Sequence, residues 1–382
     1  MYNGFFDKFH IGAYCLAKDC RDEEHVRDVR ECGVDLLFLV NNDRALLDLL
    51  YKYNVGAVVN GVLPGWFGQD GKNAGTMKAT NPPEAYISRS RLFVDHPAIV
   101  GIDVGDEPSA LDLPYYGEVI ELMKKPFTDK LLYLNIYPSY GMLADAGKEQ
   151  AKCELGTDNY KDYLRAYVDN VSLPYLSFDH YLYSSDLAAF LGDLQDASDV
   201  AREYGKHLMI VLQVNSKNPD VFLSIDELRH QAWCSLAFGV RAITWACYSP
   251  GWWHNCVLDK DGRKTEQYEK LKKVNAEIRS ITDKYISLTH QSAEIVKKGS
   301  ITETCGTSIS ADCDLLIGRF LSIDGADACI LVPLKEGGSV TINHLGSENV
   351  QRLCHTPEKT FVLNGQNDSV KLTGLPIFMY SE

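Results

Sequence analysis

Several features that would assign this sequence to a functional class at once are missing. It has no apolar run near the roughly 18 residues that a membrane span requires. Residues Met1–His10 lack the basic-then-apolar pattern of a signal peptide. These absences predict a cytoplasmic protein with no membrane partner. Acidic residues outnumber basic ones by 52 to 38, giving a net charge of −14, which argues against nucleic acid as a partner.

Metal and cofactor motifs are also missing. The 11 cysteines are scattered and none forms a C-x-x-C pair, so we expect reduced thiols and no zinc site. No His-x-His occurs in the first predicted strand, which argues against a metal-dependent barrel aldolase or hydrolase. No glycine-rich dinucleotide turn follows that strand. The sequence therefore predicts neither a metal nor an organic cofactor.

What the sequence does contain is a regular alternation of apolar runs and helical patterns. Eight such units fill about 280 residues, the size of a (β/α)8 barrel. The predicted strands are His10–Leu16, Val34–Val40, Val55–Val62, Ile99–Gly105, Leu131–Tyr137, Tyr175–Tyr181, His207–Val214 and Ala242–Cys247. We predict an α/β fold with a TIM barrel over residues 1–285.

The pattern changes after about residue 286, where short β-type runs are separated by Gly, Asn and Asp turns. These runs are Leu315–Ser322, Ala328–Pro333, Ser339–Asn343, Thr360–Leu363 and Ser369–Leu372. They predict a small antiparallel β-sandwich domain over residues 286–382.

The stretch Ile99–Pro108 is the most informative one in the chain. Its apolar strand runs directly into Asp106-Glu107 and ends at proline. A period of two puts Asp103 and Glu107 on the inner face, with Asp103 expected as a hydrogen-bonded group inside the barrel. The same parity aims Asp106 at the helices unless a bulge redirects it. Glu107 falls at the carboxyl end of the strand, where barrel enzymes place their chemistry.

Other strand ends show the same change from apolar to polar. Each predicted strand has one apolar face for the helix layer and one face that becomes polar toward its carboxyl end. This predicts a polar cup that contains Glu107, Asn135, Tyr137, Asp179, Tyr181 and Gln213.

Aromatic residues gather at the same end of the predicted barrel. Sugar rings stack on large, rigid, amphipathic aromatic surfaces, so these residues are candidate carbohydrate contacts. They are Trp66, Trp245, Tyr248 and Trp252, with Trp253 at the rim of the pocket and His254 beside it as a further candidate.

These motifs resemble those of the retaining (β/α)8 glycoside hydrolases of clan A. The shared features are Asp-Glu-Pro after the fourth strand, Tyr137-Pro138 after the fifth, Asp179-x-Tyr181 on the sixth and a trailing β-sandwich. The resemblance implies that Glu107 is the general acid/base. It also implies a glutamate nucleophile at the end of the seventh strand, where this chain has Gln213. An amide cannot act as nucleophile or base.

Three hypotheses accommodate this departure. Asp179 is the second carboxylate of a hydrolase acting on a small glycoside or oligosaccharide, and the separation of the carboxyls decides between retention and inversion. Alternatively, Asp106 and Glu107 serve a substrate-assisted N-acetylhexosaminidase-type reaction. In the third, the barrel binds carbohydrate without cleaving it. The sequence leaves the sugar, its anomeric configuration and the oligomeric state open.

Overall fold

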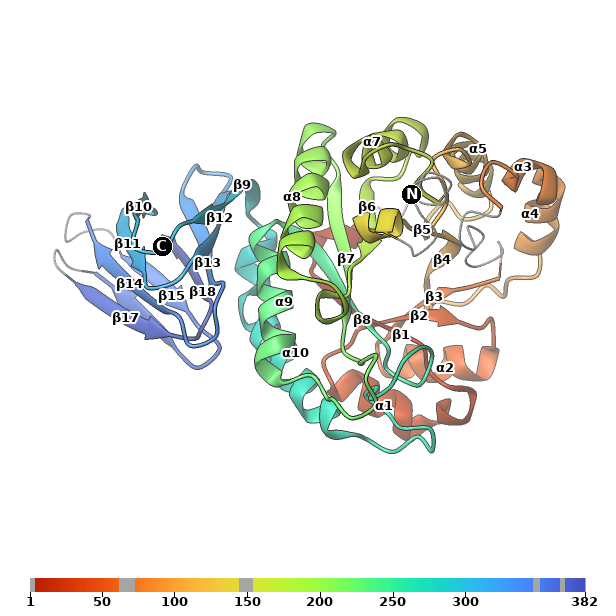
Figure 1. Cartoon of the computed structure of the whole chain (residues 1–382). Helices are drawn as coiled ribbons and strands as arrows, with labels where there is room; N and C mark the ends of the chain where they lie inside the picture. Colours follow the sequence, from red (N-terminus) through yellow and green to blue (C-terminus); the bar gives the residue numbers. More distant parts are fainter. Residues whose placement is uncertain (1–3, 62–72, 144–153, 346–350, 365–367, 382) are drawn as a thin grey trace. The chain divides into compact units, whose positions relative to one another are not determined.

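The computed structural model describes residues 4–61, 73–143, 154–345, 351–364 and 368–381. Eight parallel strands form its first sheet (Figure 1). They are β1 (His10–Tyr14), β2 (Leu36–Val40), β3 (Gly56–Val59), β4 (Ile99–Asp106), β5 (Leu131–Asn135), β6 (Tyr175–Asp179), β7 (His207–Gln213) and β8 (Val240–Ala246). All eight fall on the predicted apolar runs.

This sheet closes on itself. The strand order is β5-β4-β3-β2-β1-β8-β7-β6, and a parallel bridge between Ile136 and Phe178 joins the two ends of that order. The Ile136 N–H donates to the Ser177 carbonyl at 2.8 Å across the junction. Most strand residues are buried, as expected of a parallel sheet covered on both faces. The predicted TIM barrel is confirmed.

Helices connect the strands and begin where the sequence offers side-chain caps. The α-helices are α1 (Glu23–Glu31), α2 (Arg44–Lys52), α3 (Met77–Thr80), α4 (Pro83–Ser90), α5 (Leu113–Met123), α7 (Tyr160–Asn170), α8 (Leu187–Glu203), α9 (Ile225–Ala237) and α10 (Glu266–Ile286). The side chains of Asp22, Asp43, Asn159 and Asp186 accept hydrogen bonds from the first turns of α1, α2, α7 and α8. No helix within the described ranges has the length and apolarity needed to cross a bilayer.

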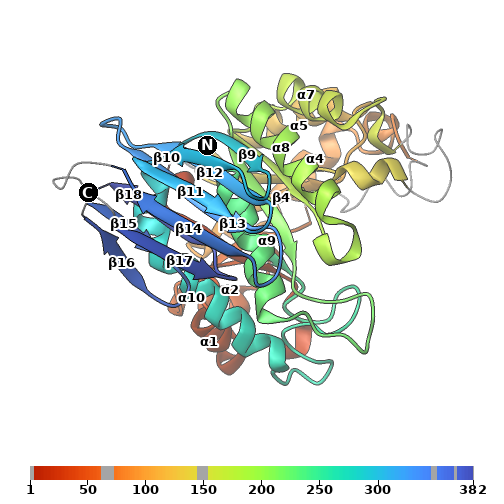
Figure 2. The same ribbon diagram turned by 60° about the vertical axis from the view of Figure 1, so that its left-hand side comes forward.

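Two antiparallel sheets follow the barrel (Figure 2). Their strands are β9 (Thr289–Val296), β10 (Ile301–Thr304), β11 (Thr307–Ala311), β12 (Leu315–Leu321), β13 (Asp327–Pro333), β14 (Ser339–His344), β15 (Arg352–His355), β16 (Thr360–Leu363), β17 (Ser369–Thr373) and β18 (Ile377–Ser381). The sheets have the orders β10-β11-β14-β17 and β16-β15-β18-β13-β12-β9. One buried cluster takes Ile309 and Val340 from the first sheet and Ile317 and Leu331 from the second, so the sheets form the predicted sandwich.

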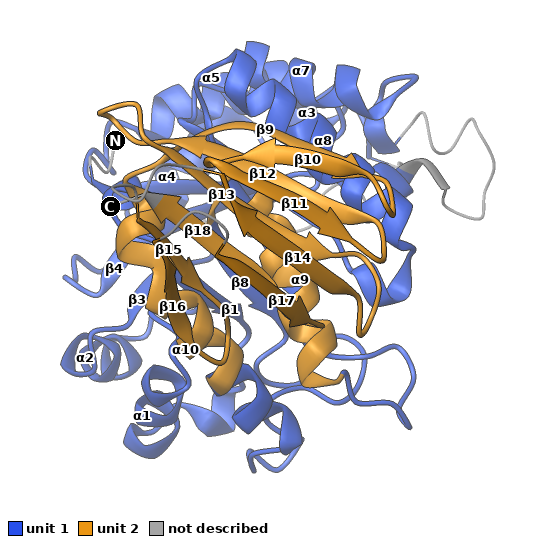
Figure 3. Ribbon diagram, turned by 90° about the vertical axis from the view of Figure 1, so that its left-hand side faces the viewer, with its two compact units in different colours: residues 1–223, 242–272 blue, residues 224–241, 273–382 orange. Residues whose placement is uncertain are grey.

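The two compact units of the chain do not coincide with the barrel and the sandwich. One unit contains Met1–Leu223 and Ala242–Lys272, and the other contains Ser224–Arg241 and Lys273–Glu382 (Figure 3). Helix α9 thus belongs with the sandwich, where it contacts β12 and β13. The domain boundary predicted between residues 285 and 286 stays a prediction.

Within the second unit, α9 is held by close packing and by a buried ion pair. The guanidinium of Arg229 on α9 makes two hydrogen bonds of 2.8 and 2.9 Å to Glu277 on α10. Gly318 on β12 lies against the backbone of α9, so that a Cβ built on it would be 2.1 Å from the Ala237 carbonyl oxygen. Only glycine allows this approach.

We therefore predict that Gly318→Ala lowers the free energy of unfolding of the second unit by about 1–3 kcal/mol, the usual effect of overpacking. Urea unfolding monitored by circular dichroism measures the change. Gly192→Ala in α8 is the control, because its Cβ meets no atom within 4 Å and alanine favours a helix. Equal stability of Gly318→Ala and the wild type would contradict the packing described here.

Candidate functional site

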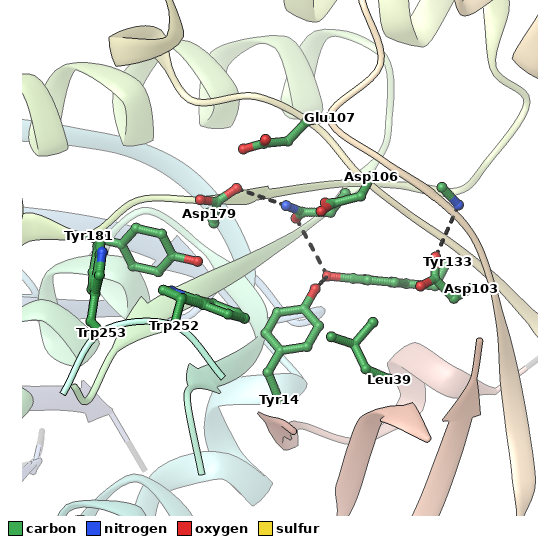
Figure 4. A pocket seen from close by; sticks show the side chains of 12 residues that line it. Tyr14, Leu39, Asp103, Asp106, Glu107, Tyr133, Asp179, Tyr181, Trp252 and Trp253 are labelled. Carbon is green, nitrogen blue, oxygen red and sulfur yellow. Dashed lines mark hydrogen bonds between the residues drawn. The ribbon is translucent and has the colours of Figure 1, made fainter. Parts of the chain in front are cut away.

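A cavity of about 470 Å³ lies at the carboxyl ends of the barrel strands, the end where barrel enzymes carry their active sites. All of its lining residues belong to the first unit. They are Tyr14, Leu39, Asp103, Gly105, Asp106, Glu107, Tyr133, Asn135, Asp179, Tyr181, Trp252 and Trp253 (Figure 4).

Strand β4 and the residue after it bring three carboxyl groups to the cavity, and a bulge in the pairing of β4 with β5 accounts for one of them, Asp106. Asp103 and Gly105 lie opposite consecutive residues of β5, so Val104 is an extra residue with no counterpart. The bulge reverses the parity of everything after it. Asp106 therefore lines the cavity instead of facing the helices, which is the exception that the sequence analysis allowed for.

The backbone after the bulge turns Glu107 toward the same space. Glu107 has a φ of +46°, in the left-handed region, and its N–H donates to the Asn135 carbonyl at 2.9 Å. Gly105 has a φ of +151°, and a Cβ there would lie 2.6 Å from the ring of Tyr116. This glycine is thus required both by its backbone conformation and by the close approach of that ring.

Burial changes the proton affinity of the carboxyl groups. It raises the pKa of Asp103 to about 7, while a hydrogen bond from the Gly105 N–H opposes the rise. Burial, followed by the charges of Asp179 and Asp103, raises the pKa of Asp106 to about 8. The pKa of Glu107 is raised well above its ordinary value by burial, then by the charges of Asp179 and Asp106.

Asp179 is the carboxyl best stabilised as an anion. Burial raises its pKa as well, but hydrogen bonds to its oxygens oppose this effect. The Asn135 amide donates to Asp179 at 2.8 Å, and the Tyr140 hydroxyl lies 3.4 Å from its other oxygen. The Asn135 oxygen in turn accepts from the Ser177 hydroxyl at 3.2 Å. After burial, the charge of Asp179 is the largest cause of the raised pKa of Glu107, and both carboxyls line the same cavity.

Aromatic rings form another wall of the cavity. Tyr181 lies between two tryptophans, with ring centroids 6.4 Å from Trp252 and 5.0 Å from Trp253. Tyr14 also approaches Trp252, at 6.1 Å. In Figure 4 these rings lie on one side of the cavity and the β4 carboxyls on the other. A flat apolar ligand that carries polar groups on its edge matches such a space.

Seven of the residues predicted for the site lie in this cavity: Glu107, Asp106, Asp179, Asn135, Tyr181, Trp252 and Trp253. The structure therefore brings the three acids together with a predicted amide and three predicted rings. Their roles in binding or catalysis stay predictions.

Gln213 is not among the lining residues. It is 1% exposed, and its amide oxygen accepts from the Tyr183 N–H at 3.1 Å while its nitrogen donates to the Asn215 carbonyl at 2.9 Å. These contacts tie the end of β7 to the loop after β6. The Gln213 side chain therefore hydrogen bonds to backbone groups of these loops. The predicted polar cup had it facing the cavity instead.

Other predicted contacts lie elsewhere for different reasons. Trp245 is buried and has the opposite parity to Thr244, whose hydroxyl faces Gly12. Tyr137 and Tyr248 are buried outside the cavity lining. His254 is exposed and its backbone pairs with Ser216. Trp66 lies outside the described residues.

The cavity lining also contains Tyr14, Leu39 and Tyr133, which the sequence patterns did not predict as site residues. Tyr133 has the same parity as Asn135, so the period-two pattern that selected one also pointed to the other. The Tyr14 and Tyr133 hydroxyls hydrogen bond at 2.7 Å. Leu39 enters the lining through a φ of +56°, for which the sequence gives no signal. Across the described ranges, no group of three or more His, Cys, Asp or Glu residues is arranged to hold a metal ion.

Comparisons with known proteins bear on the fold. No family model and no curated protein matches the chain, but solved structures do. A catalytic mutant of a GH42 β-galactosidase from G. stearothermophilus matches with a TM-score of 0.61 and 7% identity over 98% of each chain. A provisionally named α-L-fucosidase from Bacteroides thetaiotaomicron matches with a TM-score of 0.50 and 10% identity, covering 70% of this chain and 94% of that one. The likeness is one of fold.

The raised carboxyl pKa values predict that stability falls as the pH rises. Asp103 and Asp106 have folded-state pKa values of about 7 and about 8 against an ordinary 3.8, so the folded protein holds protons that the unfolded chain releases. Their contribution is complete below about pH 4 and is lost as the pH rises through about 7 to 8. Each carboxyl lowers the free energy of unfolding by up to about 1.4 kcal/mol per pH unit in that window.

Urea unfolding at pH 5 and pH 8 measures this dependence. Asp103→Asn should weaken it, because the amide has no proton to lose. Asp129→Asn, at a position where the side chain is 75% exposed, should leave it unchanged. A stability that rises from pH 5 to pH 8 in the wild type would refute the assigned direction.

Proposed function

We propose that this protein is a glycoside hydrolase that acts on a small glycoside or oligosaccharide. The observation that carries the proposal is the position of Glu107 and Asp179 in the lining of one cavity walled by aromatic rings. Two carboxyl groups with different proton affinities, facing one space, are what glycoside hydrolysis requires. The fold shared with a GH42 β-galactosidase supports the same reaction class.

The two carboxyls take different roles in this proposal. Glu107 keeps its proton near neutral pH, because burial and two neighbouring negative charges raise its pKa. It donates that proton to the leaving oxygen as general acid. Asp179, held as an anion by Asn135 and Tyr140, attacks or stabilises the oxocarbenium-like centre. The departure at Gln213 is then no obstacle, because the second carboxylate comes from β6.

The separation of the two carboxyls decides the stereochemical outcome. Inverting enzymes separate their two carboxyls by ~6.5–9.5 Å to admit a water molecule, whereas retaining enzymes place them ~5–5.5 Å apart. We propose the retaining route, in which Asp179, held as an anion by Asn135, is the nucleophile. Glu107 then returns as general base for hydrolysis of the glycosyl-enzyme.

The cavity supports a short ligand. Its volume of about 470 Å³ falls in the lower part of the ~300–1,000 Å³ range of small-molecule sites. Tyr181 and Trp252 offer ring faces for the C–H surface of a sugar. We infer that the substrate is a monosaccharide glycoside or a short oligosaccharide cleaved from its end.

One observation favours a second candidate reaction. The bulge at Val104 turns Asp106 into the cavity beside Glu107, the placement that a substrate-assisted N-acetylhexosaminidase needs to orient a 2-acetamido group. Nitrophenyl glycosides with and without that group separate the candidates. Cleavage confined to the N-acetyl substrates would replace Asp179 with the substrate's own amide as nucleophile.

Glu107→Gln tests the general acid. Turnover of glycosides with poor leaving groups should fall by about 10²- to 10⁴-fold, because the amide cannot donate a proton to the leaving oxygen. Turnover of nitrophenyl glycosides, which depart without that help, should fall less in the glycosylation step. Steady-state kinetics on a matched pair of substrates measures both effects.

Glu118→Gln is the control for that change, because Glu118 is an exposed residue paired with Lys78 outside the cavity. It should turn over both substrates like the wild type. Near-normal cleavage of the poor substrate by Glu107→Gln would remove this residue from the mechanism.

Asp179→Ala tests the nucleophile. The variant should be inactive on every leaving group, and added azide should restore cleavage of an activated glycoside with formation of a glycosyl azide of inverted configuration. Nuclear magnetic resonance of the product reports the anomer. A glycosyl azide of retained configuration would assign Asp179 to the acid/base role instead.

A further inference from the structure

The charge of the cavity wall is one-sided. Asp103, Asp106, Glu107 and Asp179 all line it, and none of the twelve described lining residues is Lys, Arg or His. Lys217 lies 5.1 Å from the centre of the Trp253 ring but is not part of the lining. A ligand that carries a carboxylate, sulfate or phosphate would meet the Asp179 anion and three further acids without a compensating cation among these residues.

Asp103 presents a second acceptor to this space. It is 9% exposed, and one of its carboxyl oxygens accepts the Gly105 N–H at 3.0 Å. Within the described ranges the other oxygen accepts no hydrogen bond and is not among the fully buried polar atoms, so it is open to a ligand in the cavity. The proposed reaction assigns Asp103 no step.

The opposite wall also suits a positive charge. Tyr14, Tyr181, Trp252 and Trp253 enclose the cavity, and aromatic faces attract cations, most strongly where water is excluded. Carboxyl groups on one side and ring faces on the other form an environment that stabilises an ammonium group. A neutral hydroxyl group in the same place is stabilised much less than an ammonium group, both by the carboxyls and by the aromatic rings.

We propose that the cavity selects an amino sugar, whose protonated amine is held by Asp103 and Asp106. This inference rests on the proposed function for the reaction, but the selectivity is a property of binding and holds for the unreacted sugar. Uncharged parent sugars bind more weakly, and N-acetylation of the amine removes the preference. Acidic sugars are rejected.

Ammonium binding must displace protons from the site. Near pH 7 the carboxyl of Asp106 is largely protonated, since its pKa is about 8 under the influence of burial and of the charges of Asp179 and Asp103. A cation placed beside it favours the charged form. Binding of an amino sugar therefore releases protons to the buffer, whereas binding of its uncharged parent releases none.

Isothermal titration calorimetry on the full chain at pH 7 tests the proposal. The probes are glucosamine, galactosamine and mannosamine, each beside its parent hexose, its N-acetyl derivative and its uronic acid. At least one hexosamine should bind about tenfold more tightly than its parent, the increment of a charge-assisted hydrogen bond. Its binding heat should depend on the ionisation enthalpy of the buffer, because protons are released.

Two aspartate variants locate the effect. Asp106→Asn should reduce the ratio of amine to parent-hexose affinity toward unity, and Asp129→Asn, at a position that is 75% exposed, should bind all probes like the wild type. Equal binding of a hexosamine and its parent, tighter binding of a uronic acid, or an undiminished preference in Asp106→Asn would each overturn the proposal.

The test of amine-selective binding can fail or succeed independently of the test of glycoside cleavage. Amine-selective binding without cleavage of any glycoside would support this inference and refute the proposed hydrolase. Cleavage of neutral glycosides with no preference for the amine would do the reverse.

Discussion

The free energy of burying negative charge governs this site more than any other interaction. Four carboxyl groups lie around one cavity at the end of the barrel, and a buried carboxylate without a partner is strongly destabilising. The protein accommodates them by supporting one anion with hydrogen bonds and by keeping protons on the others near neutral pH. The difference between Glu107, whose pKa is raised well above its ordinary value, and Asp179, whose anion is supported by hydrogen bonds, follows from that distribution.

Rigid neighbours fix this distribution in space. Asn135 on β5 donates to Asp179 and receives a hydrogen bond from Ser177, so its amide orientation is set by two partners on β6. Side chains that stand on paired strands of a closed barrel have little freedom to move apart. The proton affinities of the acids thus depend on the same β5–β6 junction that closes the sheet.

Much of the architecture was predictable from the sequence. The alternation of apolar runs with helical patterns located all eight barrel strands, because strands buried on both faces are distinctively apolar. The sandwich was predicted less completely, because the predicted runs omitted β9, β10, β11, β15 and β18. Strands β9 and β10 carry no apolar run, whereas β18 is apolar and buried and was missed despite that signal. Parity also placed Asn135 and Asp179 on the inner face, where the structure has them. Glu107 lines the cavity as predicted, but through a left-handed residue after the bulge and not through the parity of a regular strand.

The period-two pattern predicts side-chain direction poorly near the ends of strands. It predicts that Gln213 faces the cavity, but that side chain hydrogen bonds to the backbone of the loops after β6 and β7. The pattern could not predict that Leu39 lines the cavity, because a residue with a left-handed φ does not follow the side-chain alternation of a strand. The pKa values of the carboxyl groups could not be predicted from the sequence either. They depend on which groups are buried together in the fold and not on the order of residues along the chain.

The extra residue at Val104 has a consequence for how this barrel is compared with others. Beyond that residue, each side chain of β4 occupies the place that a regular strand would give to the residue one step earlier. A residue-by-residue alignment with an unbulged barrel must therefore leave a gap opposite Val104. Without that gap, Asp106 and Glu107 would be matched to the wrong neighbours even where the backbones superpose.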